Sequence, residues 1–195
     1  MGLWTYVILF AVVFSETGLI FLSFLPGDSL LFIIGALSAN DKLDLIFIMI
    51  SLSIAAILGD TVNYHIGKFI GPKIFNKKDS KFFNMKYLVE THDFYEKYGG
   101  KTIVIARLIP IIRGFMPFVA GIGTMPYKRF LFYNIIGGVL WVVIVTSAGY
   151  FFGNIPIVKD NFFIVVVAIV IISVLPVVIN ELRKNYNGNG ETKDN

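Results

Sequence analysis

Two arginines inside an apolar run constrain this chain most. Residues 106–121 have the composition of a membrane segment, yet they contain Arg107 and Arg113. A guanidinium stays protonated at any accessible pH, so its burial requires partner groups or water. In a bilayer such a charge costs at least about 2.5 kcal/mol, which makes it a functional-site candidate. Four residues that disfavour a regular helix interrupt the run: Pro110, Gly114, Pro117 and Gly121. Because irregular backbone at membrane depth persists only when protein buries it or it lines a wet cavity, we expect a re-entrant segment with an anion-binding cavity.

The composition supports a membrane protein. Of the 195 residues, 56% are hydrophobic and 15% are charged, whereas a soluble domain is about a quarter charged. The chain has no cysteine, which excludes disulfides and thiolate metal or redox sites, and its two histidines argue against a His-rich metal centre. We therefore expect neither a metal nor another cofactor. The N-terminal apolar run lacks a basic region and a small-residue cleavage site, so we expect no cleavable signal peptide.

The apolar segments predict an all-α membrane protein. Four segments are long enough to span a bilayer as helices: 3–25, 45–66, 130–152 and 162–180. After the break at Pro26 and Gly27, the apolar run of residues 30–39 is too short to span, which predicts a re-entrant hairpin at about 21–39.

A second broken segment lies at about 102–125. Between the two broken segments, residues 70–99 mix lysines with aromatic residues, which indicates an amphipathic segment on the membrane surface. The same composition suits nucleic-acid binding, but a position between membrane segments disfavours that interpretation.

Lysine and arginine in the loops predict the orientation. The basic loop at 68–101 and the basic residues at 126–129 and 183–184 should be cytoplasmic. The segment 102–125 then enters and leaves by one face. Traced backwards, this topology places the turn at Lys42 outside, both termini in the cytoplasm, and the 21–39 hairpin entering from outside. Two opposed re-entrant hairpins are the pattern of an inverted repeat with a site at the bilayer midplane. We predict one helical-bundle domain over residues 1–183 and a disordered tail over 184–195.

The arginine spacing suggests how the site forms. Six residues on an unbroken helix would leave Arg107 and Arg113 about 120° apart, so a break at Pro110 or Gly114 is needed to bring them together. Arginine suits bidentate recognition of phosphate or carboxylate. The alternative is that each arginine pairs statically with Glu16 or Asp28.

Glu16 and Asp28 are the acidic side of the predicted site. An incoming phosphate would compete with these carboxylates for the arginines and favour their protonation, which is a physical basis for proton coupling. Glu16 has the alternative of facing the wet interface, and Asp28 that of capping the helix that begins at Ser29. Four further candidates are weaker: Asp60, Tyr64, His65 and Asn134.

The chain resembles the DedA family, whose domain is also called the VTT or SNARE-associated domain. The resemblance covers about residues 5–180 and rests on four motifs in order: Glu16 followed by Phe24-Leu25-Pro26-Gly27-Asp28-Ser29-Leu30-Leu31; Gly59-Asp60-x-x-x-Tyr64-x-x-Gly67; Arg107-x-x-Pro110-x-x-Arg113-x-x-x-Pro117-x-x-Ala120-Gly121; and Met125-x-x-x-x-Phe130-x-x-x-Asn134-x-x-Gly137-x-x-x-Trp141. It implies a bacterial inner-membrane protein that translocates lipid phosphates, above all undecaprenyl phosphate, with dependence on the proton motive force. It also implies an essential acidic pair and an essential arginine pair, at Glu16, Asp28, Arg107 and Arg113.

We therefore predict a proton-coupled lipid-phosphate flippase. Its partners would be membrane lipids and protons, not nucleic acid, and a homo-oligomer remains an open alternative. Competing functions are a broad phospholipid scramblase, a proton-dependent antiporter of small ions or drugs, and a purely structural factor of membrane biogenesis. We do not expect an enzyme, because the apolar segments offer no clear His–carboxylate pair and no metal cluster.

Overall fold

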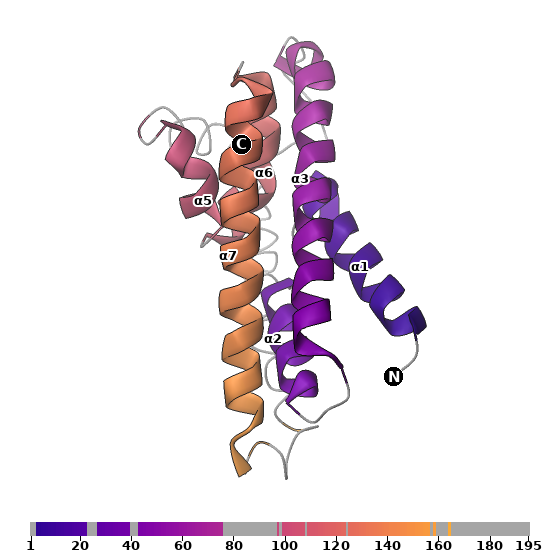
Figure 1. The fold of residues 1–195 in the computed structure, drawn as a ribbon. Helices are drawn as coiled ribbons and strands as arrows, with labels where there is room; N and C mark the ends of the chain where they lie inside the picture. Colours follow the sequence, from indigo (N-terminus) through magenta and orange to yellow (C-terminus); the bar gives the residue numbers. More distant parts are fainter. Residues whose placement is uncertain are drawn as a thin grey trace, which may run out of the picture.

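The computed structural model describes residues 3–22, 27–39, 43–75, 97, 99–107, 109–123, 125–156, 158 and 164. These residues form helices and no strands, which confirms the predicted all-α class (Figure 1). The elements follow in this order: α1 (Leu3–Gly18), the 3₁₀ turn η1 (Ile20–Leu22), α2 (Gly27–Ser38), α3 (Leu45–Phe75), the 3₁₀ turn η2 (Gly99–Lys101), α5 (Thr102–Ala106), α6 (Pro110–Ile122) and α7 (Tyr127–Gly153).

Two long antiparallel helices, α3 and α7, form the frame of the bundle (Figure 1). Residues Leu45–Phe69 of α3 and all of α7 are apolar and long enough to cross a bilayer. Their outward positions carry exposed large apolar side chains, such as Ile50 on α3 and Ile144 on α7. An apolar outer face of this length suits lipid rather than water, so the two expected spanning helices at 45–66 and 130–152 are present.

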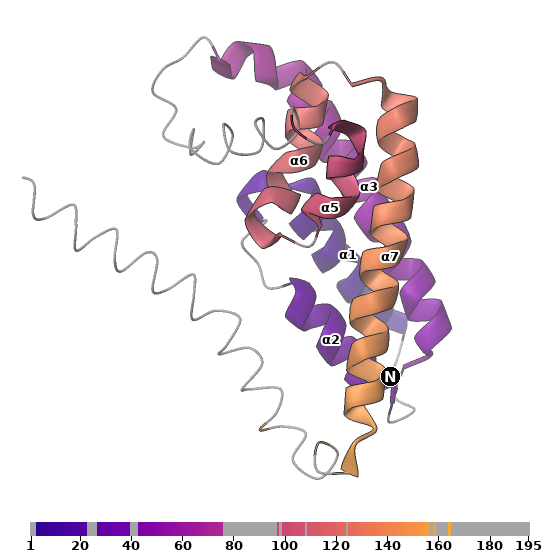
Figure 2. The ribbon, with the colours of Figure 1, turned by 90° about the vertical axis from the view of Figure 1, so that its left-hand side faces the viewer.

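The shorter helices divide between the two long ones. Helices α1 and α6 pack mainly on α3, whereas α2 packs mainly on α7 and α5 contacts both α7 and α6. In Figures 1 and 2, α1 and α2 lie toward the end of the bundle at which α3 begins and α7 ends, and α5 and α6 lie toward the opposite end. Glycines allow the close approach: a Cβ at Gly35 of α2 would lie 2.0 Å from the Thr146 carbonyl oxygen of α7.

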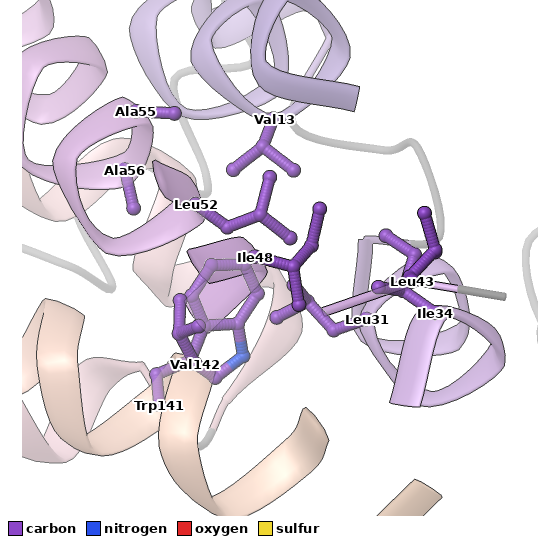
Figure 3. Packing of buried hydrophobic residues seen from close by; sticks show 10 residues of the cluster. All are labelled: Val13, Leu31, Ile34, Leu43, Ile48, Leu52, Ala55, Ala56, Trp141 and Val142. Atoms are coloured by element: carbon purple, nitrogen blue, oxygen red, sulfur yellow. The ribbon is translucent and has the colours of Figure 1, made fainter. Parts of the chain in front are cut away.

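The largest hydrophobic core lies where α1 and α2 meet the long helices (Figure 3). Its members come from α1, α2, α3, α7 and the turn before α3: Val13, Leu31, Ile34, Leu43, Ile48, Leu52, Ala55, Ala56, Trp141 and Val142. Trp141 is the one residue of this core with a polar edge, and its indole points toward the start of α2.

The first helix corrects two expectations. Helix α1 has 16 residues, about 24 Å of rise against a hydrocarbon core of about 30 Å, so the expected spanning helix at 3–25 is wrong. The helix ends at Gly18, which packs on Gly59 of α3, and the chain turns there. The backbone N–H of Asp44 donates to the Tyr6 hydroxyl over 3.1 Å. The beginning of α1 and the turn before α3 therefore lie at the same end of the bundle. The expectation that the N-terminus and the turn at Lys42 lie on opposite sides of the membrane was also wrong.

The break in the arginine segment is narrower than expected. Helix α5 ends at Ala106 and α6 begins at Pro110, where a proline is tolerated because its missing N–H has no helical partner. Gly114, Pro117 and Gly121 lie inside a continuous α6, so they are not breaks. Gly121 instead allows contact with α3, since a Cβ there would lie 2.1 Å from the Tyr64 carbonyl oxygen.

Several predictions fall outside the described residues. Helix α3 continues to Phe75, into the start of the surface segment expected at 70–99. Most of that segment, Pro26, the expected spanning helix at 162–180 and the tail at 184–195 lie outside the described part of the chain.

Candidate functional site

Arg113 joins the two broken segments. It lies in the first turns of α6, and its guanidinium donates through Nη2 to Glu16 Oε1 over 2.7 Å and through Nη1 to Asp28 Oδ1 over 2.6 Å. Glu16 is near the end of α1, and Asp28 is the second residue of α2. Each of the three residues therefore lies close to a break in the chain, where helix ends leave room for a charged side chain.

Arg107 ends α5 and has a different set of partners. It forms an ion pair with Asp60 of α3 and donates to Asn134 Oδ1 of α7 over 2.7 Å. Asn134 in turn donates to the Ile57 carbonyl oxygen over 3.1 Å. The sequence ranked Asp60 and Asn134 only as weaker candidates, yet they hold one of the two arginines.

Trp141 is a site residue that the sequence analysis named only as the last position of a resemblance motif. Its Nε1–H donates to Asp28 Oδ1 over 2.6 Å. Its ring centroid lies 5.0 Å from Cζ of Arg113 and 5.8 Å from Cζ of Arg107, within the range of a cation–π interaction. A helical signal could have found it, because Asn134 and Trp141 are seven residues apart and share one face of α7.

The cluster is closed except at one edge. The side chains of Glu16, Arg107, Asp60 and Arg113 are 2–10% exposed, whereas that of Asp28 is 46% exposed. A cavity of about 20 Å³ lies among these groups, enough for about one water molecule. It is lined by Glu16, Thr17, Asp60, Arg107, Arg113, Gly114 and Trp141.

The charges in the cluster do not balance. Two guanidinium groups face three carboxylates, so the fully ionised cluster has one negative charge in excess. Two buried polar atoms of the charged cluster, Glu16 Oε2 and Arg107 Nε, have no hydrogen-bond partner within the described part of the chain. Spare hydrogen-bonding capacity and excess carboxylate together suit a site that exchanges protons and takes a further polar ligand.

Gly27 shapes the acidic side of the cluster. A Cβ built on Gly27 would lie 2.0 Å from Glu16 Oε2 and 2.2 Å from Glu16 Oε1. The carboxylate of Glu16 therefore occupies the space that a side chain at position 27 would need. This close approach is what lets the end of α1 and the start of α2 present their carboxylates to the same arginine.

Nearby polar residues hold the helices rather than line the cavity. Asn63 of α3 donates to the Gly114 carbonyl oxygen over 2.9 Å and to the Thr17 carbonyl oxygen over 3.3 Å. The Tyr64 hydroxyl donates to the Met125 carbonyl oxygen over 2.5 Å. The structure therefore does not bring Tyr64 to the charged cluster.

His65 also lies apart from the cluster. Its Nδ1 contacts the Thr61 carbonyl oxygen over 2.7 Å, and its ring packs against Tyr64 and Tyr127. Within the described residues, no group of three or more His, Cys, Asp or Glu side chains could hold a metal ion.

Comparisons with known proteins agree on one family. The family model of the VTT domain matches residues 25–151. The chain is 54% identical over 184 residues to Protein DedA of Escherichia coli strain K12, covering 93% of this chain and 84% of that protein. It is 36% and 34% identical to the inner membrane proteins YghB and YqjA of the same strain, covering 80% and 78% of this chain and 71% and 69% of those proteins. No solved structure matches the chain.

Proposed function

We propose that this chain, which belongs to the DedA family of VTT-domain membrane proteins, translocates a lipid phosphate across the bacterial cytoplasmic membrane with proton coupling. Undecaprenyl phosphate is the lipid that we expect. The observation that carries the proposal is Arg113, whose side chain is only 10% exposed and is held by two carboxylates of the separate α1–α2 segment. A phosphate cannot cross hydrocarbon unassisted, so a flippase needs such a charge inside the bundle while the lipid tail stays in the bilayer.

The two broken segments act as re-entrant hairpins in this proposal. Helices α1 and α2 have 16 and 12 residues and α6 has 13, all too short to span as single helices. The α1–α2 unit and the α5–α6 unit lie toward opposite ends of the bundle (Figure 1). Glu16, Asp28, Arg107 and Arg113 all lie beside the breaks of these units, which fits two opposed hairpins that meet at a midplane site.

The same four residues and Asp60 lie on a seam between two groups of helices. Glu16, Asp60 and Arg113 belong to α1, α3 and α6, which pack together, whereas Asp28 belongs to α2 and packs with α7. Arg107 follows α5, which contacts α7, and it pairs across the seam with Asp60. Arg113 pairs across the seam with Asp28. A small movement of one group against the other would open the site and break both ion pairs, which is how access would alternate.

Protons enter the cycle through the carboxylates. When the lipid phosphate binds Arg113, Asp28 loses the guanidinium that compensates its charge, and Glu16 shares that guanidinium with the phosphate. A carboxylate left without its guanidinium in a dry site gains from taking up a proton. Release of the lipid restores the ion pairs and expels the proton, so lipid movement and proton movement are linked.

The orientation and the membrane are part of the proposal. From the basic residues between α3 and α5 we infer that this end of the bundle faces the cytoplasm and that the turn before α3 lies on the outer side. Two of the relatives carry the name inner membrane protein. We accordingly assign this chain to the bacterial inner membrane.

A liposome assay tests the function. Purified protein is reconstituted with a labelled undecaprenyl phosphate, and movement between leaflets is followed with and without an imposed pH difference. We expect the wild type to move this lipid and the pH difference to accelerate it, and we expect Arg113→Ala to fall to the rate of protein-free liposomes. Arg129→Ala is the matched control, because Arg129 is an exposed arginine at the start of α7.

The outcomes separate the competing functions. Equal movement by Arg113→Ala and the wild type would refute the proposed mechanism. Movement of phosphatidylcholine at the same rate without a gradient would indicate a scramblase. Dissipation of an ion gradient in liposomes without any phosphate lipid would indicate an antiporter.

A further inference from the structure

Two hydrogen-bond donors from different helices converge on one oxygen atom of the cluster. Asp28 Oδ1 accepts from Arg113 Nη1 of α6 and from Trp141 Nε1 of α7, both over 2.6 Å. The Trp141 ring also lies against the Arg113 guanidinium, 5.0 Å from its Cζ. The two donors and the aromatic face therefore define a position that fits one negatively charged oxygen.

The Asp28 carboxylate is the group in this arrangement that a ligand can replace most easily. The side chain of Asp28 is 46% exposed, whereas the Arg113 side chain is 10% exposed and Trp141 is 5% exposed. In the closed site the two donors are held in place, because Trp141 is packed in the core and Arg113 keeps a second bond to Glu16. An indole N–H can only donate, so it needs an acceptor whenever Asp28 moves away. An incoming anion would supply that acceptor.

We propose that Trp141 Nε1 and Arg113 Nη1 form an anion seat, which Asp28 occupies between transport events and a phosphate oxygen of the substrate occupies during them. Trp141 is then a substrate-binding residue. The ligand chemistry is a terminal phosphate group, carried by a lipid as a monoester or present as inorganic phosphate. The inference rests on the proposed function for the choice of phosphate, but the seat itself follows from the geometry.

The seat explains why a tryptophan suits this position. A phenylalanine would fill most of the same core volume and keep an aromatic face toward Arg113, but it would lack the N–H. A guanidinium together with an added N–H binds phosphate more strongly than the guanidinium alone, because a hydrogen bond to a charged group is stronger than one between neutral groups. The indole thus adds a directional donor at the point where Arg113 supplies charge.

The first test is Trp141→Phe in the liposome assay. We expect the half-saturating concentration of undecaprenyl phosphate to rise about tenfold, because one hydrogen bond to a charged group is lost. The maximal rate per folded protein should stay unchanged, as expected when a binding contact is removed. A packing role alone predicts an unchanged half-saturating concentration and less folded protein, and that result would overturn the proposal. Trp4→Phe is the control, because Trp4 is 78% exposed on α1.

The second test uses fluorescence. The chain has two tryptophans, so Trp4→Phe leaves Trp141 as its single indole reporter. This variant in phosphatidylcholine nanodiscs is titrated with undecaprenyl phosphate and, separately, with inorganic phosphate. We expect a saturable emission change that disappears when Arg113→Ala is added. A response to the lipid alone assigns the seat to a lipid head group, and a response to both assigns it to phosphate in general.

The two proposals can fail separately. Unchanged Trp141 emission in a variant that still transports the lipid would overturn the seat and leave the flippase. A saturable emission change without any lipid movement would support the seat and overturn the flippase.

Discussion

Replacing Gly27 by alanine should disable the site without unfolding the protein. An added Cβ would lie 2.0 Å from Glu16 Oε2, whereas real Cβ contacts stay beyond about 3.0 Å, so the carboxylate must move by about 1 Å. It is the end of a flexible side chain, and Gly27 has no positive φ, so the backbone need not move. The cost therefore falls on the geometry of the 2.7 Å hydrogen bond between Glu16 and Arg113.

The magnitude follows from that one bond. A hydrogen bond to a charged group contributes about 1.5–3 kcal/mol, so its loss changes an equilibrium about 10- to 100-fold. We expect Gly27→Ala to reduce lipid-phosphate translocation by a factor in this range. The loss of this bond should also lower the melting temperature of the purified protein in detergent, but only by several degrees at about 2–4 °C per kcal/mol, since alanine itself is a good residue for a helix.

Gly35→Ala is the matched contrast in the same helix. Its Cβ would lie 2.0 Å from the Thr146 backbone carbonyl oxygen, which cannot move without separating α2 from α7. We expect Gly35→Ala to lower the melting temperature and the yield of folded protein. The reasoning about position 27 would be refuted if Gly27→Ala transported at the wild-type rate, or if it lost stability as Gly35→Ala does.

Three further substitutions test the contacts around the site. Asp60→Asn leaves the Arg107 charge buried without its counter-charge, which should cost about 3–5 kcal/mol of stability, and Asp60→Asn/Arg107→Met should regain much of it in a thermal-shift measurement. Asn63→Leu removes the donor that ties α3 to the carbonyls of α1 and α6, and should destabilise by about 1–3 kcal/mol; an unchanged melting temperature would contradict the assigned role. Tyr64→Phe removes the hydroxyl that binds the Met125 carbonyl oxygen, and should cost about 1 kcal/mol while transport per folded protein is kept. A selective loss of transport would place Tyr64 in the site after all.

The sequence predicted the parts of the fold that depend on local composition. Long apolar runs specify α3 and α7 because a helix is the simplest structure that satisfies its own backbone in a bilayer. The short run after Gly27 was recognised as too short to span, and it is α2. The predicted length of the first helix was too great, since the apolar residues around the 3₁₀ turn at Ile20–Leu22 have the same composition as a spanning helix. Composition does not show where a chain turns back.

The sequence also indicated that the four charged residues Glu16, Asp28, Arg107 and Arg113 need partners. Their cost in an apolar environment is a property of each residue and its neighbours, so it can be read locally. The structure brings all four together with Asp60, Asn134 and Trp141. The importance of Asp60, Asn134 and Trp141 could not be deduced in the same way. Asp60, for example, lies near the middle of a long apolar helix and shows the same local sequence pattern whether it pairs with an arginine or faces a water-filled space.

By itself, the sequence determined that this chain is a helical membrane protein with two arginines in an apolar segment, where they demand acceptors. Only the tertiary structure decided which acceptors they have. Arg107 pairs with a carboxylate 47 residues away, Arg113 with two carboxylates 85 and 97 residues away, and Asp28 receives an indole N–H from 113 residues away. The physical reason is that the demand for a partner is set by local burial, whereas the partner is supplied by whichever helix the packing of glycines and core side chains brings alongside.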